Sequence, residues 1–531
     1  MSFHFFGNGL LNIESKGIAA PALILAVSSV ASRALGILRD WLLAQRFGAG
    51  PDLDVYYAAF RAPDFVYNLL VFGGITVAFL PLFSDYFQKS KDEAWRFAAN
   101  LLNIFSFFLI LAGIAGFVFA PALAAVVAPG FSAGQLAQAA MLSRLMFLSP
   151  IIFGIASIFS GILQYFKRFL AYSLAALFYN LGIIFGIIFL APSLGIFGVG
   201  MGVVLGALLY LLVQVWPAFA CGFKWKPVFD LRADSLKNVF KLMLPRTLGI
   251  AANQINLVVP VIILSAGRAG SISIFNLASN IFSLPVGIIG VSWATAAFAP
   301  FSKYFAEDRL DQLAEKFAQT ARQIGFLIIP SAIFMFCLAR PLVDLLYYHG
   351  EFTFYHAEHT AYALMAFCLG IYFTAIMPVM FRLFFAMRDT ASPTWSTVIS
   401  VAVNVALSFW FASVGSGNKV LGLALIYSLA NALQFTILFF LLWRKNKKLV
   451  LIKEIGVSLV KSIGAGILAG VALSLTIDIL PLSAYPLWNL IVGGVVGSAV
   501  YLAIAWFLKS PELKEFIPKK WNTTNQRSGI S

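Results

Sequence analysis

Long apolar runs recur from one end of the chain to the other, separated by short polar or charged stretches. Each run has about 20 or more residues, the length that an α-helix needs to cross the hydrocarbon of a bilayer. We therefore predict an all-α polytopic membrane protein with about fourteen transmembrane helices. Their ranges are 18–47, 55–83, 96–120, 135–163, 169–191, 196–220, 239–266, 271–302, 320–340, 355–386, 392–414, 420–443, 455–480 and 486–508.

The charged residues between the runs are distributed unevenly across the predicted membrane. If the N-terminus is cytoplasmic, most of the 37 lysines and arginines fall on the cytoplasmic side. The outer connections at 120–135 and 191–196 carry no charge. Because cytoplasmic loops are enriched in lysine and arginine, the asymmetry predicts that both termini are cytoplasmic. It also accounts for the net charge of +15, so we expect no nucleic-acid partner.

Composition and motifs narrow the class of protein further. With 61% hydrophobic and 11% charged residues, the chain has too little polar surface for a soluble protein. The three cysteines show no CxxC spacing, and we interpret them as packing residues. No nucleotide-binding loop, nucleophile elbow, HExxH motif or pair of catalytic acids is present. We therefore expect a transporter rather than an enzyme, with no cofactor and no metal site.

The second half of the chain echoes the first. The matching segments are 33–37 with 246–250, 78–81 with 297–300, and Asn180 with Asn404. Six spans per repeat is an even number, so both copies enter the membrane in the same direction. This predicts two six-helix lobes related by a pseudo-two-fold axis along the membrane normal, followed by two C-terminal helices. The predicted domains are an N-terminal tail (1–17), an N-lobe (18–220), a cytoplasmic linker (221–238), a C-lobe (239–443), spans thirteen and fourteen (444–509) and a cytoplasmic tail (510–531).

The first two spans carry an unusual number of charges, at Arg33, Arg39, Asp40, Asp54 and Arg61. A charge near the middle of a bilayer costs at least ~2.5–3.5 kcal/mol. Arg33 lies about 22 Å into the first span at ~1.5 Å per residue, and it shares a helix face with Asp40. We interpret these residues as the wall of a polar cavity that offers guanidinium groups to phosphate or carboxylate. The alternative is an internal ion pair that only fixes helix packing.

The second span also contains helix-weakening residues: Pro63, the pair Gly73 and Gly74, and Pro81. Proline removes a helical hydrogen bond and glycine loosens packing, so this helix can bend as a gate must. A static kink explains the same residues equally well.

Neutral polar residues mark three later spans. Asn256 in span seven and Asn280 in span eight predict a hydrogen-bonding wall that faces the first lobe. Asparagine also holds membrane helices together, which is an equally good explanation. Asn404 and Ser408 lie four residues apart in span eleven and indicate, weakly, a cation site.

Several short motifs resemble those of the MurJ/MviN family over nearly the whole chain. They are Ser32-Arg33-x-Leu35-Gly36-x-x-Arg39-Asp40, Phe47-Gly48-Ala49-Gly50, Asp54, Ala59-Phe60-Arg61-x-Pro63, Ala78-Phe79-x-Pro81, Ala128-Pro129-Gly130-Phe131 and Arg388-Asp389-Thr390-x-x-Pro393. The resemblance implies a lipid II flippase of the multidrug/oligosaccharidyl-lipid/polysaccharide exporter superfamily. Such a protein moves the undecaprenyl-pyrophosphate-linked peptidoglycan precursor to the outer leaflet of the bacterial inner membrane by alternating access.

The resemblance also implies roles for residues of this chain. At several positions, however, this chain departs from the family's pattern. Arg33, Arg39, Asp54 and Arg61 match charged cavity positions, and the last two spans match a groove for the lipid tail. Tyr67-Asn68 and Asn280 stand where the family usually has arginine, and Pro260 and Ser408 stand near its sodium-site carboxylates. The predicted substrate-binding residues are Arg33, Arg39, Arg61, Asn256 and Asn280, and the predicted gate or ion-pair residues are Asp40, Asp54, Gly73 and Gly74.

Several functional questions stay open from the sequence. The driving force could be Na⁺, H⁺ or the membrane potential. Expected partners are lipid II or a related polyprenyl-pyrophosphate glycan, membrane lipid and cell-wall synthesis proteins. The alternatives are an exporter of another polyprenyl-linked glycan or of a small cation, and a non-transporting scaffold for envelope synthesis.

Overall fold

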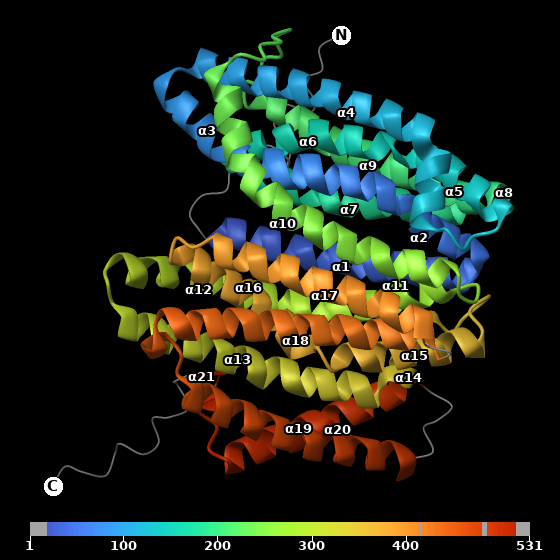
Figure 1. The fold of residues 1–531 in the computed structure, drawn as a ribbon, viewed down its shortest axis with the longest axis vertical. Coiled ribbons are helices and arrows are strands. Elements are labelled where there is room, and N and C mark those ends of the chain that lie inside the picture. The colour runs from blue at the N-terminus through green and yellow to red at the C-terminus, as the bar shows by residue number, and fades with distance from the viewer. Residues whose placement is uncertain (1–18, 415–416, 480–485, 517–531) are drawn as a thin grey trace. The chain divides into compact units, whose positions relative to one another are not determined.

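The computed structural model describes residues 19–414, 417–479 and 486–516, and their regular structure is helical throughout (Figure 1). Within these residues, each range predicted from the apolar pattern falls largely on one or more helices. The predicted N-terminal tail, 1–17, lies outside the described residues, as do residues 517–531 of the C-terminal tail.

The chain divides into two compact units, Met1–Ser273 with His349–Thr353 and Ile274–Tyr348 with Phe354–Ser531. The first unit holds α1 (Ala19–Phe47), α2 (Pro51–Val66), η3 (Tyr67–Ile75), α3 (Thr76–Lys89), α4 (Lys91–Val127), α5 (Ala133–Met146), α6 (Leu148–Tyr165), α7 (Phe169–Phe185), η4 (Gly186–Leu190), α8 (Ala191–Leu194), α9 (Ile196–Ala220) and α10 (Asp234–Ser265). The lobe boundaries expected from the sequence stay predictions.

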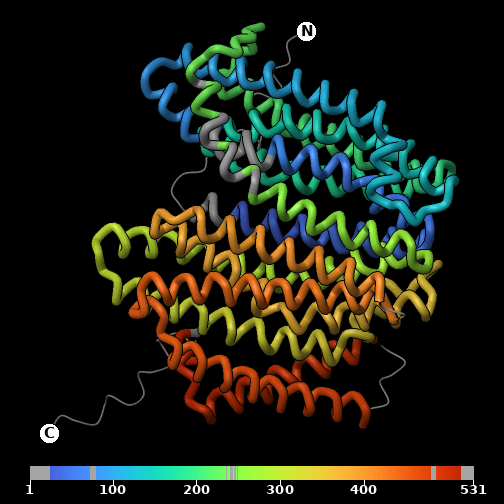
Figure 2. Tube along the Cα trace, in the orientation of Figure 1, coloured from blue at the N-terminus to red at the C-terminus, as the bar shows by residue number. Residues whose placement is uncertain are grey.

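The second unit begins within α11 (Ser271–Pro285), whose first turn belongs to the first unit. It continues with η5 (Val286–Gly290), α12 (Val291–Ala306), α13 (Leu310–Cys337), α14 (Ala339–Tyr347), α15 (Phe354–Cys368), α16 (Ile371–Ala386), α17 (Ala391–Val414), α18 (Lys419–Lys445), η6 (Lys447–Leu449), α19 (Ile452–Ile479), α20 (Pro486–Phe507) and α21 (Pro511–Phe516). Helices α19 and α20, the red pair in Figure 2, pack side by side.

The described helices are those of a multi-pass membrane protein. Ten of the helical segments searched are long and apolar enough to cross a membrane, or eleven if α15 and α16, bent by 48°, form one span. The first two predicted spans are not among the ten, and they are the spans that carry the charges noted in the sequence. Fourteen membrane crossings stay a prediction.

Polar residues cap the starts of two helices of the first unit. Ser90 precedes α4, and its side chain accepts a hydrogen bond from the backbone N–H of Glu93. Ser132 precedes α5 and forms a reciprocal pair of hydrogen bonds with Gln135. These caps satisfy backbone N–H groups that have no partner within the helix, so Ser90 and Ser132 help to set where α4 and α5 start.

Two π-helical segments lie at matching places of the predicted repeat. The first, η3, contains Gly73 and Gly74 and separates α2 from α3 within span two. The second, η5, ends at Gly290 within span eight. A π-helical segment interrupts the regular hydrogen-bond ladder, and such segments frequently occur at functional sites. The helix irregularity expected at the two glycines is therefore present, and its role as a gate stays a prediction.

Aromatic side chains form much of the core of the first unit. Phe79 and Phe83 on α3 stack at a ring-centroid distance of 5.2 Å, and Phe97 on α4 stacks on Phe79 at 5.8 Å. Tyr165 at the end of α6 meets Phe83 edge-on at 5.1 Å. Offset and edge-on pairs of this kind stabilise a core beyond the area that they bury. They hold α3, α4 and α6 together as one packed bundle.

In the second unit, the last two long helices pack on α13. Phe326 of α13 shares a buried cluster with Ala465 and Ala469 of α19 and with Tyr501 of α20. The Tyr501 hydroxyl donates to the Phe326 backbone oxygen over 2.7 Å. The small residues on α19 allow close approach, which is the usual way that membrane helices associate.

The turn between α16 and α17 is held by Asp389. Its carboxylate accepts hydrogen bonds from the backbone N–H and the Oγ of Ser392, over 3.0 and 2.5 Å, and pairs with Lys445 at the end of α18. Partial burial raises the pKa of Asp389, but the hydrogen bonds from Lys445 and Ser392 outweigh it, so the pKa lies below its ordinary value. The ion pair therefore ties this turn to α18.

Candidate functional site

A polar seam joins α1 to α7 in the first unit. Arg39 on α1 donates from Nε and Nη2 to Oδ1 of Asp40, over 3.0 and 2.8 Å. Its Nη1 donates to Oδ1 of Asn180 on α7, over 3.3 Å. Asp40 and Asn180 are buried, whereas the Arg39 side chain is 25% exposed. A fixed guanidinium with part of its surface open can bind a second anion.

Asn180 is the centre of this seam. Its Nδ2 donates to Ser32 Oγ over 3.3 Å and to the Ala176 backbone oxygen over 3.1 Å. Further along the seam, Ser173 donates to Ser28 over 2.9 Å. The sequence identified Asn180 only as the repeat partner of a residue in span eleven, and its contact with Arg39 was missed because the two residues are 141 positions apart.

The structure also places the other charged residue of span one. Arg33 is partly buried on α1, where the sequence expected it to share a face with Asp40. Two of the hydrogen bonds to Asp40 come instead from its neighbour Arg39. The ion pair with Asp40 that the sequence left as an alternative for Arg33 is formed by Arg39. A role for Arg33 in a cavity stays a prediction.

A buried carboxylate ties α2 to the turn between α10 and α11. Asp54, in the first turn of α2, is 2% exposed. Its Oδ2 accepts from the backbone N–H of Gly270 over 2.7 Å. Its Oδ1 accepts from the backbone N–H and the Oγ of Ser273, over 2.8 and 2.6 Å. A carboxylate is well suited to the N–H groups at a helix start, which have no partner within the helix.

Close backbone contacts surround this carboxylate. Gly270 has a φ of +91°, and a Cβ at this position would collide with the Ala49 backbone oxygen. In the loop before α15, the backbone N–H of Glu351 donates to the Gln45 backbone oxygen over 2.9 Å. Three turns of the first unit therefore meet here with little between their backbones. We call this arrangement, together with Asp54, the Asp54 corner.

The irregular helix η3 is stabilised by side chains that bond to the carbonyl of Asp64. Asn68 Nδ2 donates to this oxygen over 2.9 Å, and Gln254 Nε2 from α10 donates over 3.3 Å. Polar side chains commonly satisfy carbonyls that a break in a membrane helix leaves available. Tyr67, at the first position of η3, packs its ring against Phe153 at 5.2 Å. Tyr67 and Asn68 thus both make contacts that stabilise the first turn of η3.

Arg61 lies further along α2 and is partly buried. It lines a cavity of about 670 Å³ in the first unit, between α2, α4 and α10. The other residues around this cavity are Ala62, Phe65, Val66, Ala112, Ala115, Gly116, Phe119, Leu123, Val126, Val127, Phe147, Ile255, Val258, Val259 and Ile262. Because these neighbours are apolar, the stem of Arg61 packs as a hydrocarbon. A role for its charge in a polar cavity stays a prediction.

The neutral polar residues fall in both units. Asn256 is partly buried on α10 in the first unit, and Asn280 is partly buried on α11 in the second. On α17, Ser408 donates to Asn404 Oδ1 over 3.5 Å, and both residues are buried. Within the described part of the chain, no group of three or more His, Cys, Asp or Glu could hold a metal ion. The weak cation site at Asn404 and Ser408 stays a prediction.

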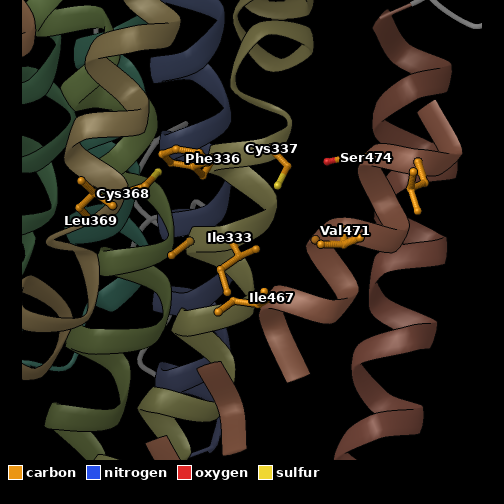
Figure 3. A pocket seen from close by; sticks show the side chains of 11 residues that line it. Ile333, Phe336, Cys337, Cys368, Leu369, Ile467, Val471 and Ser474 are labelled. Carbon is orange, nitrogen blue, oxygen red and sulfur yellow. The ribbon is translucent and has the colours of Figure 1, made fainter. Parts of the chain in front are cut away.

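An apolar pocket of about 480 Å³ lies beside the last long helices of the second unit (Figure 3). Ile333 and Cys337 of α13 line one side, and Ile467 and Val471 of α19 line the other. Cys368, at the bend between α15 and α16, completes the wall. This pocket is lined by α19 together with α13 and the α15–α16 bend, and none of its lining residues comes from α20. The lipid-tail groove implied for spans thirteen and fourteen stays a prediction.

Comparison with known proteins gives the family. The family model described as "Lipid II flippase MurJ" matches residues 43–489 of the chain. The chain belongs to this family. Among MurJ relatives named "Probable lipid II flippase MurJ", that of Buchnera aphidicola from Acyrthosiphon pisum is 26% identical over 407 residues, covering 74% of this chain and 79% of the relative. The Borreliella burgdorferi relative is 26% identical over 443 residues, covering 83% and 86%.

Solved structures agree with the family. A structure described as lipid II flippase MurJ in an inward closed conformation matches with a TM-score of 0.79 and 25% identity, covering 92% of this chain and 99% of that one. An inward-facing multidrug resistance MATE family transporter of the MOP superfamily matches with a TM-score of 0.65 and 16% identity, covering 78% and 96%. The second likeness concerns the fold alone. The resemblance noted in the sequence and the all-α membrane transporter fold are confirmed.

Proposed function

We propose that this MurJ family member moves lipid II, or a closely related polyprenyl-pyrophosphate glycan, from the inner to the outer leaflet of the bacterial inner membrane. The observation that carries the proposal is the family match over residues 43–489, together with helices that follow a MurJ structure over 99% of its length. Transport requires binding and a conformational change and no bond-making chemistry. This agrees with the absence of catalytic motifs from the sequence.

Arg39 is the residue best suited to hold the anionic head of such a substrate. Its guanidinium is oriented by Asp40 and Asn180 and still has exposed surface. Pyrophosphate oxygens accept paired hydrogen bonds from guanidinium with good geometry. Arg33 and Arg61 are proposed to add charge, and Asn256 and Asn280 to add neutral hydrogen bonds, where relatives use more arginine.

Alternating access requires parts that hold one state and parts that bend. The Asp54 corner supplies a strong set of contacts within the first unit, and we assign it to keeping the outer side closed. The segment η3, with Gly73 and Gly74, supplies the bend in span two. Breaking three hydrogen bonds to a carboxylate is costly, so the corner would make opening depend on bound substrate.

The pocket between α13, α19 and the α15–α16 bend is proposed to shelter part of the polyprenyl tail. Its lining is apolar apart from Ser474 and the two thiols of Cys337 and Cys368. Burial of hydrocarbon chain in such a pocket is favourable by about 0.8 kcal/mol per CH₂ group when the alternative is water. The tail needs such shelter only while it leaves the bilayer.

The orientation and energy source complete the proposal. Both termini are proposed to be cytoplasmic, as the distribution of lysine and arginine predicts. The membrane potential is the simplest driving force, at ~2.3 kcal/mol per charge per 100 mV, with Na⁺ or H⁺ coupling as the alternative. Cell-wall synthesis proteins that supply or consume the precursor are the expected partners.

The test is replacement of a host's own flippase. We expect this chain to restore lipid II on the outer leaflet of depleted cells, and Arg39→Ala to fail at equal expression. Arg46→Ala is the matched control, because Arg46 is exposed at the end of the same helix. The proposal is wrong if the wild-type chain reaches the membrane and exposes no lipid II, and the Arg39 assignment is wrong if both variants restore it equally.

A further inference from the structure

The connection between α9 and α10, residues 223–233, is an extended segment that lies along α4 instead of forming a helix (the green coil beside α4 in Figure 1). Asn100 of α4 holds one end of it. Asn100 Nδ2 donates to the Asp230 backbone oxygen over 3.0 Å, and the Asp230 backbone N–H donates to Asn100 Oδ1 over 2.7 Å. We call residues 223–233 the linker strap.

A second asparagine, one turn further along α4, holds the middle of the linker strap. Asn103 Nδ2 donates to the backbone oxygens of Lys226 and Val228, over 2.9 and 2.8 Å. The Trp225 indole Nε1 donates to Asn103 Oδ1 over 2.9 Å. Two asparagines thus satisfy several backbone groups of a segment that has no ladder of its own, which gives the strap a defined position.

The linker strap lies where α4 changes from charged to lipid-facing. The first turns of α4 carry Lys91 and Arg96, both exposed. Further along, Phe107 and Phe108 are exposed, as side chains in contact with hydrocarbon would be. Phe229 of the strap packs edge-on against Phe107 at 5.4 Å. The strap therefore lies where α4 passes from its charged first turns to its exposed apolar face, which is the sequence pattern of a membrane boundary.

The outward side of the strap combines aromatic and basic residues. Trp225, Phe229 and Leu231 are 56%, 50% and 52% exposed. Lys224 and Arg232 are exposed as well, and neither forms an ion pair with any residue that the structure describes. Tryptophan with lysine or arginine is the combination that membrane proteins use at the boundary between headgroups and hydrocarbon.

A third basic residue of the strap forms an ion pair within the protein. Lys226 pairs with Asp92 of α4 over 2.5 Å. This hydrogen bond, the largest influence on the group, lowers the pKa of Asp92 and keeps it ionised. Lys226 thus fixes the strap to α4. Lys224 adds to the positive field at Asp92, and the backbone N–H of Arg232 donates to Oδ1 of the exposed Asp230, but the side chains of Lys224 and Arg232 remain exposed to the outside.

We propose that the linker strap is a binding surface for anionic phospholipid headgroups of the adjacent leaflet. The phosphate of a lipid such as phosphatidylglycerol would accept hydrogen bonds from Lys224 and Arg232, while Trp225, Phe229 and Leu231 enter the upper acyl region. This surface faces bulk lipid beside α4, and it serves to hold the connection between spans six and seven at the membrane. The inference does not depend on which substrate the protein transports.

The test is lipid binding by the full chain in detergent, measured by native mass spectrometry with phosphatidylglycerol and with phosphatidylcholine as probes. A basic residue near an anionic lipid surface contributes about fivefold to affinity. We therefore expect the double variant Lys224→Gln with Arg232→Gln to weaken phosphatidylglycerol binding by on the order of twentyfold. Binding of phosphatidylcholine should hardly change.

Lys303→Gln is the matched control, because Lys303 is exposed at the end of α12, on the same predicted side of the membrane, in the second unit. It should leave phosphatidylglycerol binding within about twofold of wild type. The proposal is overturned if the wild-type chain shows no preference for phosphatidylglycerol, or if the control loses as much affinity as the double variant.

A second measurement checks the depth of the strap without relying on charge. In nanodiscs, the fluorescence difference between wild type and Trp225→Phe reports Trp225 alone. We expect lipids brominated near the glycerol backbone to quench this difference more strongly than lipids brominated near the chain ends. If neither lipid quenched this difference, Trp225 would face water and the proposal would be wrong.

Discussion

The Asp54 corner gives the sharpest prediction, because one side chain there accepts three hydrogen bonds from two residues. Asp54→Ala removes both acceptor oxygens, and with them these three hydrogen bonds and the negative charge. Hydrogen bonds to a charged group are worth about 1.5–3 kcal/mol each, and water or local relaxation recovers part of the loss. We therefore expect the local contacts of Gly270 and Ser273 to weaken by about 2–4 kcal/mol.

Hydrogen–deuterium exchange on the protein in nanodiscs measures this directly. The amide protons of Gly270 and Ser273 donate to the carboxylate, so their protection reports how often the corner opens. A loss of about 2 kcal/mol corresponds to roughly 30-fold faster exchange. Asp54→Asn keeps one carbonyl oxygen and should fall between wild type and Asp54→Ala.

The matched control is Asp52→Ala, two residues earlier in the same helical turn, where the side chain is exposed. It should leave exchange at the α10–α11 turn unchanged. If Asp54→Ala gave wild-type protection at Gly270 and Ser273, the carboxylate would not be the group that holds the corner, and our assignment of the outer closure to it would fail with it.

Three further predictions follow from single contacts. Gly270→Ala should lower thermal stability or abolish expression, because the φ of Gly270 is +91° and the new Cβ would collide with the Ala49 backbone oxygen. The control, Gly249→Ala, should leave both unchanged, because the space around Gly249 is open. Asn180→Ala should reduce lipid II flipping in the complementation assay while membrane insertion stays normal. Asn180→Gln should flip no better than Asn180→Ala, because the longer side chain displaces the oxygen that accepts from Arg39. Asp389→Asn should remove a stabilising contribution that the wild type has near neutral pH, because the pKa of Asp389 lies below its ordinary value. Thermal melts of the two proteins should therefore differ at pH 7 and converge as the pH falls through that lowered pKa.

Much of the fold could be predicted from the sequence because each span carries its own signal. The length of an apolar run shows whether it can cross the membrane. In the part of the chain that the structure describes, each predicted range falls largely on helix. The breaks were harder to place. A helix irregularity at Gly73 and Gly74 was expected, and η3 lies there. The break of span four at Phe147 was not expected, although Pro150, three residues later, lacks the backbone N–H that would bond to the carbonyl of Met146.

The site was predicted less well, because its contacts join residues far apart in the chain. The sequence singled out Arg39, Asp40 and Asp54 by the cost of burying charge, and all three make defined contacts. It could not find the partners of Asp54, because two are backbone N–H groups, which every residue has. Asn180 was likewise unremarkable until its distance to Arg39 was known.

The π-helical segments have a consequence for the side chains beyond them. A π-helical hydrogen bond spans one residue more than an α-helical one, so each extra residue rotates the rest of the helix by about 100° around its axis. Such a rotation changes which side chains face inward without ending the helix. The predicted repeat places η3 and η5 in the matching spans two and eight, so we expect the same change of face in both. The third segment, η4 in span five, has no π-helical counterpart in α17 of span eleven.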